Sequence, residues 1–407
     1  MNKYEKGKMI LLNIFIFIFI ISMFNRELLP LGIDLRYVQV AIGLILGILF
    51  IYELLKGMTK IKLNKFIILI TMFYIYVFII NLMWLRSELP INKSDFTNMI
   101  ILSFSNFLSI CVFYFYKKYI DFKKVNIYIM ISAGILLLSM LMLLGNLTLS
   151  EIMGGQYAGY YAGNDNINFF GEKIRYAGYA QDPNYASFFM WIAMISSIFY
   201  TNNKVVKGLV ILLSILGISL SASKTIVIGI ILSVIIIPIL KLIKDKSPKI
   251  ESSILNIGAI SILSLPYIIV KIMELLDGTF KMGTMSTRLS MWKNAANLFE
   301  SNFIFGNGIT SFRSYFSIQP KGWYVHSHST VFQLLSEVGL IGFILFLLVI
   351  VYLISISNKY YKYILLTFLI FSLTTELLHL TVFSFVIGLI PCKLLNENEE
   401  KEVLLNQ

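Results

Sequence analysis

The sequence predicts an all-α polytopic membrane protein with about twelve transmembrane helices and a long outer loop before the tenth. Of its 407 residues, 57% are hydrophobic and only 14% are charged, and the mean hydropathy is +0.79. Apolar stretches of about 17 to 25 residues, the length that spans a bilayer, recur along the whole chain. Basic residues fall in short clusters between them, as in the cytoplasmic loops of membrane proteins. We therefore expect a single membrane domain over residues 1–407.

Twelve apolar runs are the expected spans. The first follows a basic start, as in a signal peptide, but no small-x-small cleavage site follows it and another span comes directly after, which favours a retained helix. The last two share one apolar stretch broken by TTELLHL. The runs cover residues 9–24, 38–55, 66–85, 96–116, 125–145, 184–200, 205–221, 225–243, 254–276, 330–356, 363–377 and 378–392.

Charge in the connecting segments sets the expected orientation. KGMTKIKLNK, KKYIDFKK and KLIKDKSPK each contain four lysines and lie on the same predicted side. Lysine and arginine accumulate on the cytoplasmic side of membrane proteins, so we expect both termini there. Two long loops, residues 146–183 and 277–329, then face outward. Long ordered loops tend to carry function, and we expect the second loop to carry catalytic elements.

Composition also argues against several functions. The formal net charge is +12, but the basic residues are not gathered on one domain, so nucleic-acid binding is not expected. The two cysteines, Cys111 and Cys392, fall in or beside predicted spans near the cytoplasmic face, which does not suggest a disulfide framework. No Gly-rich nucleotide loop is recognisable on the inner side.

Two of the three histidines lie one residue apart in GWYVHSHS, where the second outer loop meets the tenth span. On an extended segment, His326 and His328 would point the same way. Three interpretations follow. The pair could bind a metal with His379 as a third ligand, although no nearby cysteine supports this. It could be a polar element of the membrane interface, or it could supply a general base or an anion partner.

Four sequence elements in order resemble those of the O-antigen ligase and polymerase superfamily. HSHSTVFQLLSEVGLIG is similar to its His-x-His-Asn and Glu-x-Gly-x-x-Gly signature, with Ser329 where asparagine is usual. RYAGYAQDPNYASFF, SLSASKTIVIG and STRLSMWKNAANLFESNFIFGNGITSFR resemble three upstream elements. In this chain Lys224 replaces the usual arginine, and Trp292 stands where ligase members often have leucine. The resemblance covers residues 175–343.

The resemblance implies a membrane-embedded, GT-C-like glycosyltransferase that needs no metal, nucleotide or other cofactor. Such enzymes transfer a glycan from an undecaprenyl-diphosphate carrier to a sugar hydroxyl, with inversion at the anomeric carbon. The acceptor hydroxyl needs a base, for which His328 is the candidate, with His326 and Arg288 as further catalytic residues. The leaving diphosphate needs cations. The candidates on the outer face are Arg175, Lys224, Arg288 and Arg313.

Each of these cations also has a purely structural interpretation. Arg175 precedes a span and could anchor at lipid headgroups. Lys224 could snorkel to the interface. Arg288 could stabilise a loop helix, whose apolar stripe would comprise Leu289, Trp292, Ala296 and Phe299. For Arg313, the structural interpretation is the stronger of the two.

The motif beyond the histidines contains an acid and glycines. Glu337 would lie inside the membrane, where an acid needs a partner, so we expect it and Gly339 to support the site. Gly306 and Gly308 are better explained by turn geometry than by phosphate binding, since no Lys-Ser/Thr pair follows them.

These features favour a bacterial polysaccharide polymerase of the inner (plasma) membrane that joins undecaprenyl-diphosphate-linked repeat units. An O-antigen ligase, which differs in its acceptor, is the first alternative. The second is a transporter or lipid-linked oligosaccharide flippase, which would favour broken or charged helices near the midplane. Few midspan charges are present (Lys271, Glu274 and Glu337). Expected partners are the lipid-linked oligosaccharide and membrane lipids, with a flippase and a chain-length regulator as further candidates.

Overall fold

A computed structural model describes residues 3–24, 35–59, 63–85, 92–144, 161–165, 173–180, 182–246, 248–275, 283–318 and 326–405. Parts of the two predicted outer loops lie outside these residues, namely 145–160, 166–172, 181, 276–282 and 319–325. The described part of the chain is helical apart from one two-stranded ribbon, which confirms the predicted all-α membrane fold.

The helices before the ribbon account for the first five predicted spans. They are α1 (Lys3–Phe24), α2 (Leu35–Leu55), α3 (Lys65–Trp84), α4 (Lys93–Phe115), the short η1 (Lys117–Tyr119) and α5 (Phe122–Leu144). The ribbon follows, with η2 (Gly178–Ala180) after it, and then α7 (Pro183–Tyr200), α8 (Lys204–Ser221), α9 (Lys224–Lys246) and α10 (Pro248–Leu275).

Two shorter helices precede the histidine motif, and the remaining spans follow it. The first group is α11 (Gly283–Ser301) and α12 (Ser311–Ser317). The tenth span is continuous over α13 (Thr330–Gln333), the π-helical turn η3 (Leu334–Val338) and α14 (Gly339–Ile356). The chain ends with α15 (Lys359–Ser372), α16 (Thr381–Ser384), a second π-helical turn η4 (Phe385–Leu389) and α17 (Ile390–Leu405).

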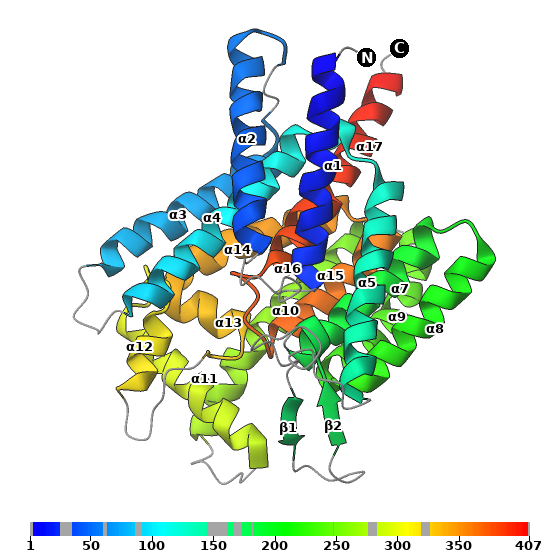
Figure 1. Cartoon of the computed structure of the whole chain (residues 1–407). Coiled ribbons are helices and arrows are strands. Elements are labelled where there is room, and N and C mark those ends of the chain that lie inside the picture. The colour runs from blue at the N-terminus through cyan, green and yellow to red at the C-terminus, as the bar shows by residue number, and fades with distance from the viewer. Residues whose placement is uncertain are drawn as a thin grey trace.

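Nine segments of the described chain are long and apolar enough to cross a membrane. The other three predicted spans fall on α7, on the 14-residue α15 and on the continuous run from α16 to α17. The start of α1 and the end of α17 lie at the same end of the molecule, whereas the ribbon, α11 and α12 lie at the opposite end (Figure 1). Following the predicted orientation, we refer to these as the inner and outer ends.

Local sequence explains where α7 begins. The side chain of Asp182 caps the helix by accepting a hydrogen bond from the backbone N–H of Asn184 at 2.6 Å. Pro183 follows at the first helical position, where its fixed φ suits the helix and its missing N–H costs nothing. The DPN element therefore fixes where the outer end of this helix starts.

The first helices are joined by a polar network inside an apolar core. Gln39 of α2 accepts a hydrogen bond from Ser22 of α1 at 3.2 Å and donates to Ser105 and Ser109 of α4 at 3.3 and 2.8 Å. All four side chains are buried. Lipid tails are as apolar as leucine, so hydrogen bonds between helices add specificity that the hydrophobic effect does not supply inside a bilayer.

The ribbon in the first outer loop was not predicted. Strands β1 (Tyr161–Asp165) and β2 (Lys173–Tyr176) are antiparallel, and Arg175 pairs with Ala162. Helix α11, by contrast, matches the predicted loop helix. Of the predicted stripe, Trp292, Ala296 and Phe299 are buried, and Leu289 is partly buried against the cluster that contains Trp292.

One predicted midspan charge has a partner. The ammonium of Lys271 on α10 lies 2.5 Å from a carboxylate oxygen of Glu300 on α11. The two cysteines are both free, Cys392 buried and Cys111 partly buried, in line with the absence of a predicted disulfide framework.

Candidate functional site

The predicted site residues lie on segments that are far apart in the sequence. These are β2, the turn between α8 and α9, α11 and α12, the segment 326–330, and the tenth span at η3 and the start of α14. The hydrogen bonds described below connect most of these segments to one another at the outer end.

The histidine segment is held by Glu376, in the loop between α15 and α16. Oε1 of Glu376 accepts hydrogen bonds from the backbone N–H of Ser327 at 2.5 Å and from its hydroxyl at 2.7 Å. Oε2 lies 2.6 Å from Nδ1 of His326. One carboxylate thus binds two consecutive residues, and its side chain is only 10% exposed, whereas that of His326 is 51% exposed.

The backbone on both sides of Glu376 adds to this attachment. The hydroxyl of Thr330 donates to the carbonyl of Thr375 at 2.6 Å and accepts from the N–H of Leu377 at 3.0 Å. The Ser327 hydroxyl is also 3.0 Å from the carbonyl oxygen of Ser329. Residues 327–330 are therefore fixed against residues 375–377 at several points.

These contacts sustain an unusual backbone conformation at His328. Its φ is +53°, in the left-handed region that costs a residue with a Cβ atom roughly 1–2 kcal/mol. The strain persists only because the neighbouring residues are anchored. The segment is therefore not extended at His328, which was the condition for the two rings to point the same way. The ring centroids of His326 and His328 lie 6.5 Å apart at an interplanar angle of 54°.

The surroundings of His328 favour the neutral imidazole. The surrounding protein removes part of the hydration of the imidazole, which disfavours its charged form. This is the largest effect, and it lowers the pKa of His328 below its usual 6.5. Among nearby charges, Arg288 and His326 lower this pKa, while Glu376 and Asp182 raise it. The His328 side chain nevertheless remains accessible to solvent. A neutral, accessible imidazole at neutral pH can accept a proton.

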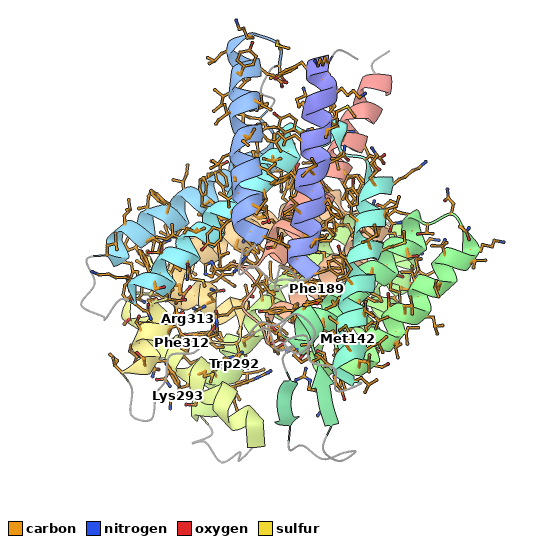
Figure 2. All side chains as sticks on the ribbon, in the orientation of Figure 1. Met142, Phe189, Trp292, Lys293, Phe312 and Arg313 are labelled. Carbon is orange, nitrogen blue, oxygen red and sulfur yellow. The ribbon has the colours of Figure 1, made fainter. Side chains whose placement is uncertain are left out.

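Arg313 of α12 is the centre of an ion-pair network. One terminal nitrogen of its guanidinium lies 2.8 Å from each carboxylate oxygen of Asp95 at the start of α4. The other is 2.6 Å from Nδ1 of His326 and 3.6 Å from Oε2 of Glu376. The Arg313 side chain is only 7% exposed. Figure 2 labels Arg313 and its neighbour Phe312, which belongs to the same apolar cluster as Trp292 of α11.

The charge of Glu376 is stabilised by this network. Burial alone would raise the pKa of Glu376, but the nearby His326 and Arg313 and the hydrogen bonds to His326 and Ser327 lower it below the usual value. Glu376 is therefore ionised at neutral pH and accepts all of these hydrogen bonds.

Glu337 lies in the tenth span and has the partners that a buried acid requires. Its Oε1 accepts a hydrogen bond from the backbone N–H of Thr310 at 2.9 Å, and its Oε2 is 4.0 Å from Nε2 of His379. The other nitrogen of His379, Nδ1, lies 3.0 Å from the hydroxyl of Ser103 on α4. His379 is thus engaged with Ser103 and Glu337, and no three His, Cys, Asp or Glu side chains in the described residues form a metal-binding group.

The glycines near Glu337 allow close backbone contact. Gly306, Gly308 and Gly339 all have positive φ, at +77°, +89° and +66°. A Cβ atom on Gly339 would approach the backbone nitrogen of Gly306 to 2.4 Å, and one on Gly308 would meet Trp84 of α3 at 2.2 Å. This confirms the turn geometry predicted for Gly306 and Gly308. The positive φ of Gly339 and its close contact with the backbone of Gly306 explain that glycine in the same way.

Arg175 joins two of the resembling elements. Its guanidinium donates to the side-chain oxygen of Asn184 at 3.0 Å and to the carbonyl of Ser221 at 3.2 Å. The hydroxyl of Ser223 donates to the same oxygen of Asn184 at 2.6 Å. The next residue, Lys224, is exposed at the first turn of α9. A cation at a helix N-terminus opposes the helix dipole, so this lysine does not stabilise its own helix there.

Sequence reasoning missed three residues that organise the site: Asp95, Glu376 and Asn184. Glu376 had a detectable signal, because it is an acid in an otherwise apolar stretch and lies three residues before His379. Asp95 lies at the start of a predicted span, where an acidic residue is ordinary. Asn184 was part of a noted element without being assigned a role.

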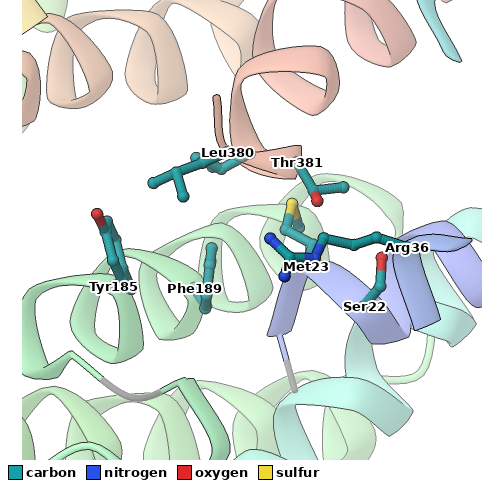
Figure 3. A pocket seen from close by; sticks show the side chains of 8 residues that line it. Ser22, Met23, Arg36, Tyr185, Phe189, Leu380 and Thr381 are labelled. Atoms are coloured by element: carbon teal, nitrogen blue, oxygen red, sulfur yellow. The ribbon is translucent and has the colours of Figure 1, made fainter. Parts of the chain in front are cut away.

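A small cavity lies next to this site. It has a volume of about 10 Å³, close to that of one water molecule, and is lined by residues of α1, α2, α7 and α16 (Figure 3). Tyr185 lines it, and the Tyr185 hydroxyl donates to the carbonyl of Glu376 at 3.4 Å. The cavity is too small for a sugar, so it does not contribute a binding site for the glycan.

Residues 209–347 match the family model described as O-antigen ligase. The matched range contains both histidines of the motif, Lys224, Arg288 and Arg313, whereas Arg175 and Glu376 lie outside it. The match supports the resemblance to the O-antigen ligase and polymerase superfamily and, at this level, an enzyme of ligase or polymerase type. No curated protein matches the chain.

Proposed function

On the premise that residues 209–347 carry an O-antigen ligase domain, we propose that this protein is a polysaccharide polymerase of the bacterial inner membrane. It joins undecaprenyl-diphosphate-linked repeat units on the outer face, with both termini in the cytoplasm. One observation carries the proposal. The exposed imidazole of His328 is held in a strained conformation by an anchored backbone, within electrostatic range of Arg288.

The proposed reaction is a single displacement at the anomeric carbon of the donor. The acceptor hydroxyl attacks this carbon while neutral His328 takes the hydroxyl proton, and the bond between the anomeric carbon and the diphosphate oxygen breaks. The electron pair of that bond leaves with the lipid diphosphate. The product is a longer glycan of inverted configuration, and His328 later returns its proton to solvent.

The leaving diphosphate carries the negative charge that develops in the transition state. We assign its stabilisation to Arg288, Arg175 and Lys224. Arginine can bind phosphate oxygens through two parallel hydrogen bonds, while lysine acts as a point charge. The contacts of Arg175 with Asn184 and Ser221 would orient its guanidinium. Arg288 would act on both the diphosphate and the protonation of His328.

For Arg313 we favour the structural interpretation over diphosphate binding. Its guanidinium contacts two carboxylates, those of Asp95 and Glu376, and is nearly buried. We therefore assign Arg313, with Glu376, to positioning the histidine segment rather than to binding diphosphate. His326 belongs to the same network, which supports a positioning role for it too.

The second candidate is an O-antigen ligase, which the description of the matching family favours. It would use the same donor and the same base with another glycolipid as acceptor. The family match gives no support to a transporter or flippase.

Purified protein in lipid nanodiscs, given an undecaprenyl-diphosphate-linked repeat unit as the sole substrate, tests the proposal. A polymerase yields a ladder of glycans that differ by one repeat. A ligase yields a product only after an acceptor glycolipid is added. Absence of any transfer under both conditions would contradict both candidates.

A further inference from the structure

A groove opens between α3 and α4 on the outer half of these helices. Its volume is about 370 Å³, within the range of small-molecule sites, and seven of its nine lining side chains are apolar or aromatic. Figure 1 shows α3 and α4 side by side, with α12 beyond their outer ends. The groove is lined by Tyr74, Ile75, Val77, Phe78, Asn81, Ile100, Ser103, Phe104 and Phe107.

The two polar residues of the groove connect it to the site. Asn81 lies three residues before the end of α3. Its side-chain oxygen accepts a hydrogen bond from the backbone N–H of Ile309 at 2.8 Å. The Ser103 hydroxyl is bonded to His379, which faces Glu337. Lining residues of the groove thus touch the turn that leads into α12 and the loop that contains Glu376.

The groove runs along α3 and α4 toward the candidate site. On α3 the lining residues run from Tyr74 to Asn81, and on α4 from Phe107 back to Ile100, so the groove extends roughly 10 Å along each helix at 1.5 Å per residue. Its outer end, at Asn81 and Ile100, is the end nearest the site. An elongated apolar ligand whose polar head occupies the site would enter the groove from there.

We propose that this groove binds the polyprenyl chain of the lipid-diphosphate donor, with the isoprene units next to the diphosphate between α3 and α4. The inference rests on the proposed function, which requires a donor whose head is at the outer end and whose tail lies in the bilayer. An exposed apolar surface on a membrane helix needs no ligand. This groove differs because it is concave and its polar residues hydrogen-bond to segments of the candidate site. A polyprenyl tail in the groove would therefore lie next to a diphosphate head in the site.

Two donors and two kinds of variant test the groove. The donors carry the same glycan diphosphate, one on an undecaprenyl tail and one, the short-tailed donor, on a methyl group that contains no isoprene unit and cannot reach into the groove. Ile75→Trp and Ile100→Trp fill the groove from its two walls. Met72→Trp is the control, since Met72 is on the same helix at similar exposure, 49% against 53% for Ile75, and does not line the groove.

We expect Ile75→Trp and Ile100→Trp to raise KM for the undecaprenyl donor by about tenfold, because each methylene group excluded from the groove loses its burial. KM for the short-tailed donor should stay within about twofold of the wild-type value, as should both KM values of Met72→Trp. Unchanged activity on the short-tailed donor also shows that each variant is folded. Equal KM changes in groove and control variants would overturn the inference.

A photoreactive undecaprenyl diphosphate provides an independent measurement on the wild-type protein. We expect it to label peptides of α3 and α4, and free undecaprenyl phosphate, but not excess phospholipid, to compete. Displacement by phospholipid would mean that the groove holds ordinary membrane lipid and would overturn the inference. Failure of the proposed function is a separate result, in which the wild-type protein transfers glycan from neither donor.

Discussion

Oε1 of Glu376 lies 2.7 Å from the hydroxyl of Ser327 and 2.5 Å from its backbone nitrogen, one residue before His328. The loop between α15 and α16 thereby determines the conformation of a segment about 50 residues earlier in the chain. If His328 is the base, its position depends on a carboxylate that does not touch the reacting atoms.

Glu376→Ala should therefore lower kcat while leaving the donor KM nearly unchanged. Loss of charge-assisted hydrogen bonds costs roughly 1.5 to 3 kcal/mol, which corresponds to about 10- to 150-fold in rate if the bonds are needed in the transition state. Steady-state kinetics in nanodiscs measure the split between kcat and KM. Glu376→Gln keeps an acceptor oxygen and should retain more activity than the alanine variant. Equal wild-type kcat in both variants would contradict the positioning role.

The ion pair between Arg313 and Asp95 should contribute to stability. Asp95→Ala leaves a nearly buried guanidinium with one carboxylate fewer, and such losses cost about 3 kcal/mol. We expect a lower unfolding temperature in detergent, measured by the exposure of the buried cysteine Cys392 to a thiol dye. In the double variant Arg313→Met/Asp95→Ala, the cost should be smaller than the sum of the single costs. Strict additivity would show that the two side chains do not interact energetically.

The pH dependence follows from the lowered pKa of His328. The neutral form accepts the proton, so activity is lost as pH falls through this pKa, and the acidic limb of kcat/KM should lie below pH 6.5. Arg288 carries a positive charge that lowers the pKa of His328. In Arg288→Gln this pKa should rise, so the acidic limb of the remaining kcat/KM should move to higher pH. Lys293→Gln, an exposed change on the same helix, should leave the limb in place. A limb that moves equally in both variants would contradict the local effect of Arg288.

Lys224 should bind the diphosphate even though the family usually has arginine here. Lys224→Arg keeps the charge and should retain activity, whereas Lys224→Ala and Lys224→Glu should abolish it. The measurement is glycan transfer paired with binding of undecaprenyl diphosphate. Lys207→Glu on α8 is the control for a charge reversal near the membrane surface, since Lys207 belongs to the opposite, inner end of that helix. Full turnover by Lys224→Glu would show that this lysine only snorkels.

The orientation can be tested with single cysteines in a Cys111→Ser/Cys392→Ser background. Lys293 on α11 and Lys123 at the start of α5 are both exposed and belong to opposite ends of the molecule. An impermeant thiol reagent added to spheroplasts should label Lys293→Cys and spare Lys123→Cys until the membrane is opened. The reverse pattern would place the site in the cytoplasm, where this account has no lipid-linked donor.

Most of the fold could be predicted because length and hydropathy alone determine a span. The predicted seventh span, 205–221, differs from α8 by one residue. The last stretch was harder: 363–377 and 378–392 were expected to meet directly, whereas α15 ends at Ser372 and α16 begins at Thr381. The loop between them exists because Glu376 and His379 turn toward polar partners, and hydropathy does not register those contacts.

The site could be predicted only in part for the same reason. A motif makes His328 and Arg288 candidates, because their type and spacing are local in the sequence. The partners of Arg313 are not local: Asp95 precedes it by 218 residues, and Glu376 belongs to another loop. No pattern in one sequence connects them, so the sequence could favour a structural interpretation of Arg313 without identifying its partners.

The most direct measurement is the transfer rate of His328→Ala, compared with His326→Ala, on the undecaprenyl-linked repeat in nanodiscs. Removing a general base costs about 10² to 10⁴ in rate, so His328→Ala should lose transfer by that factor while still binding the donor. His326→Ala, which removes one member of a network that Arg313 and Glu376 still hold, should be milder. Near-normal transfer by folded, donor-binding His328→Ala would contradict the account.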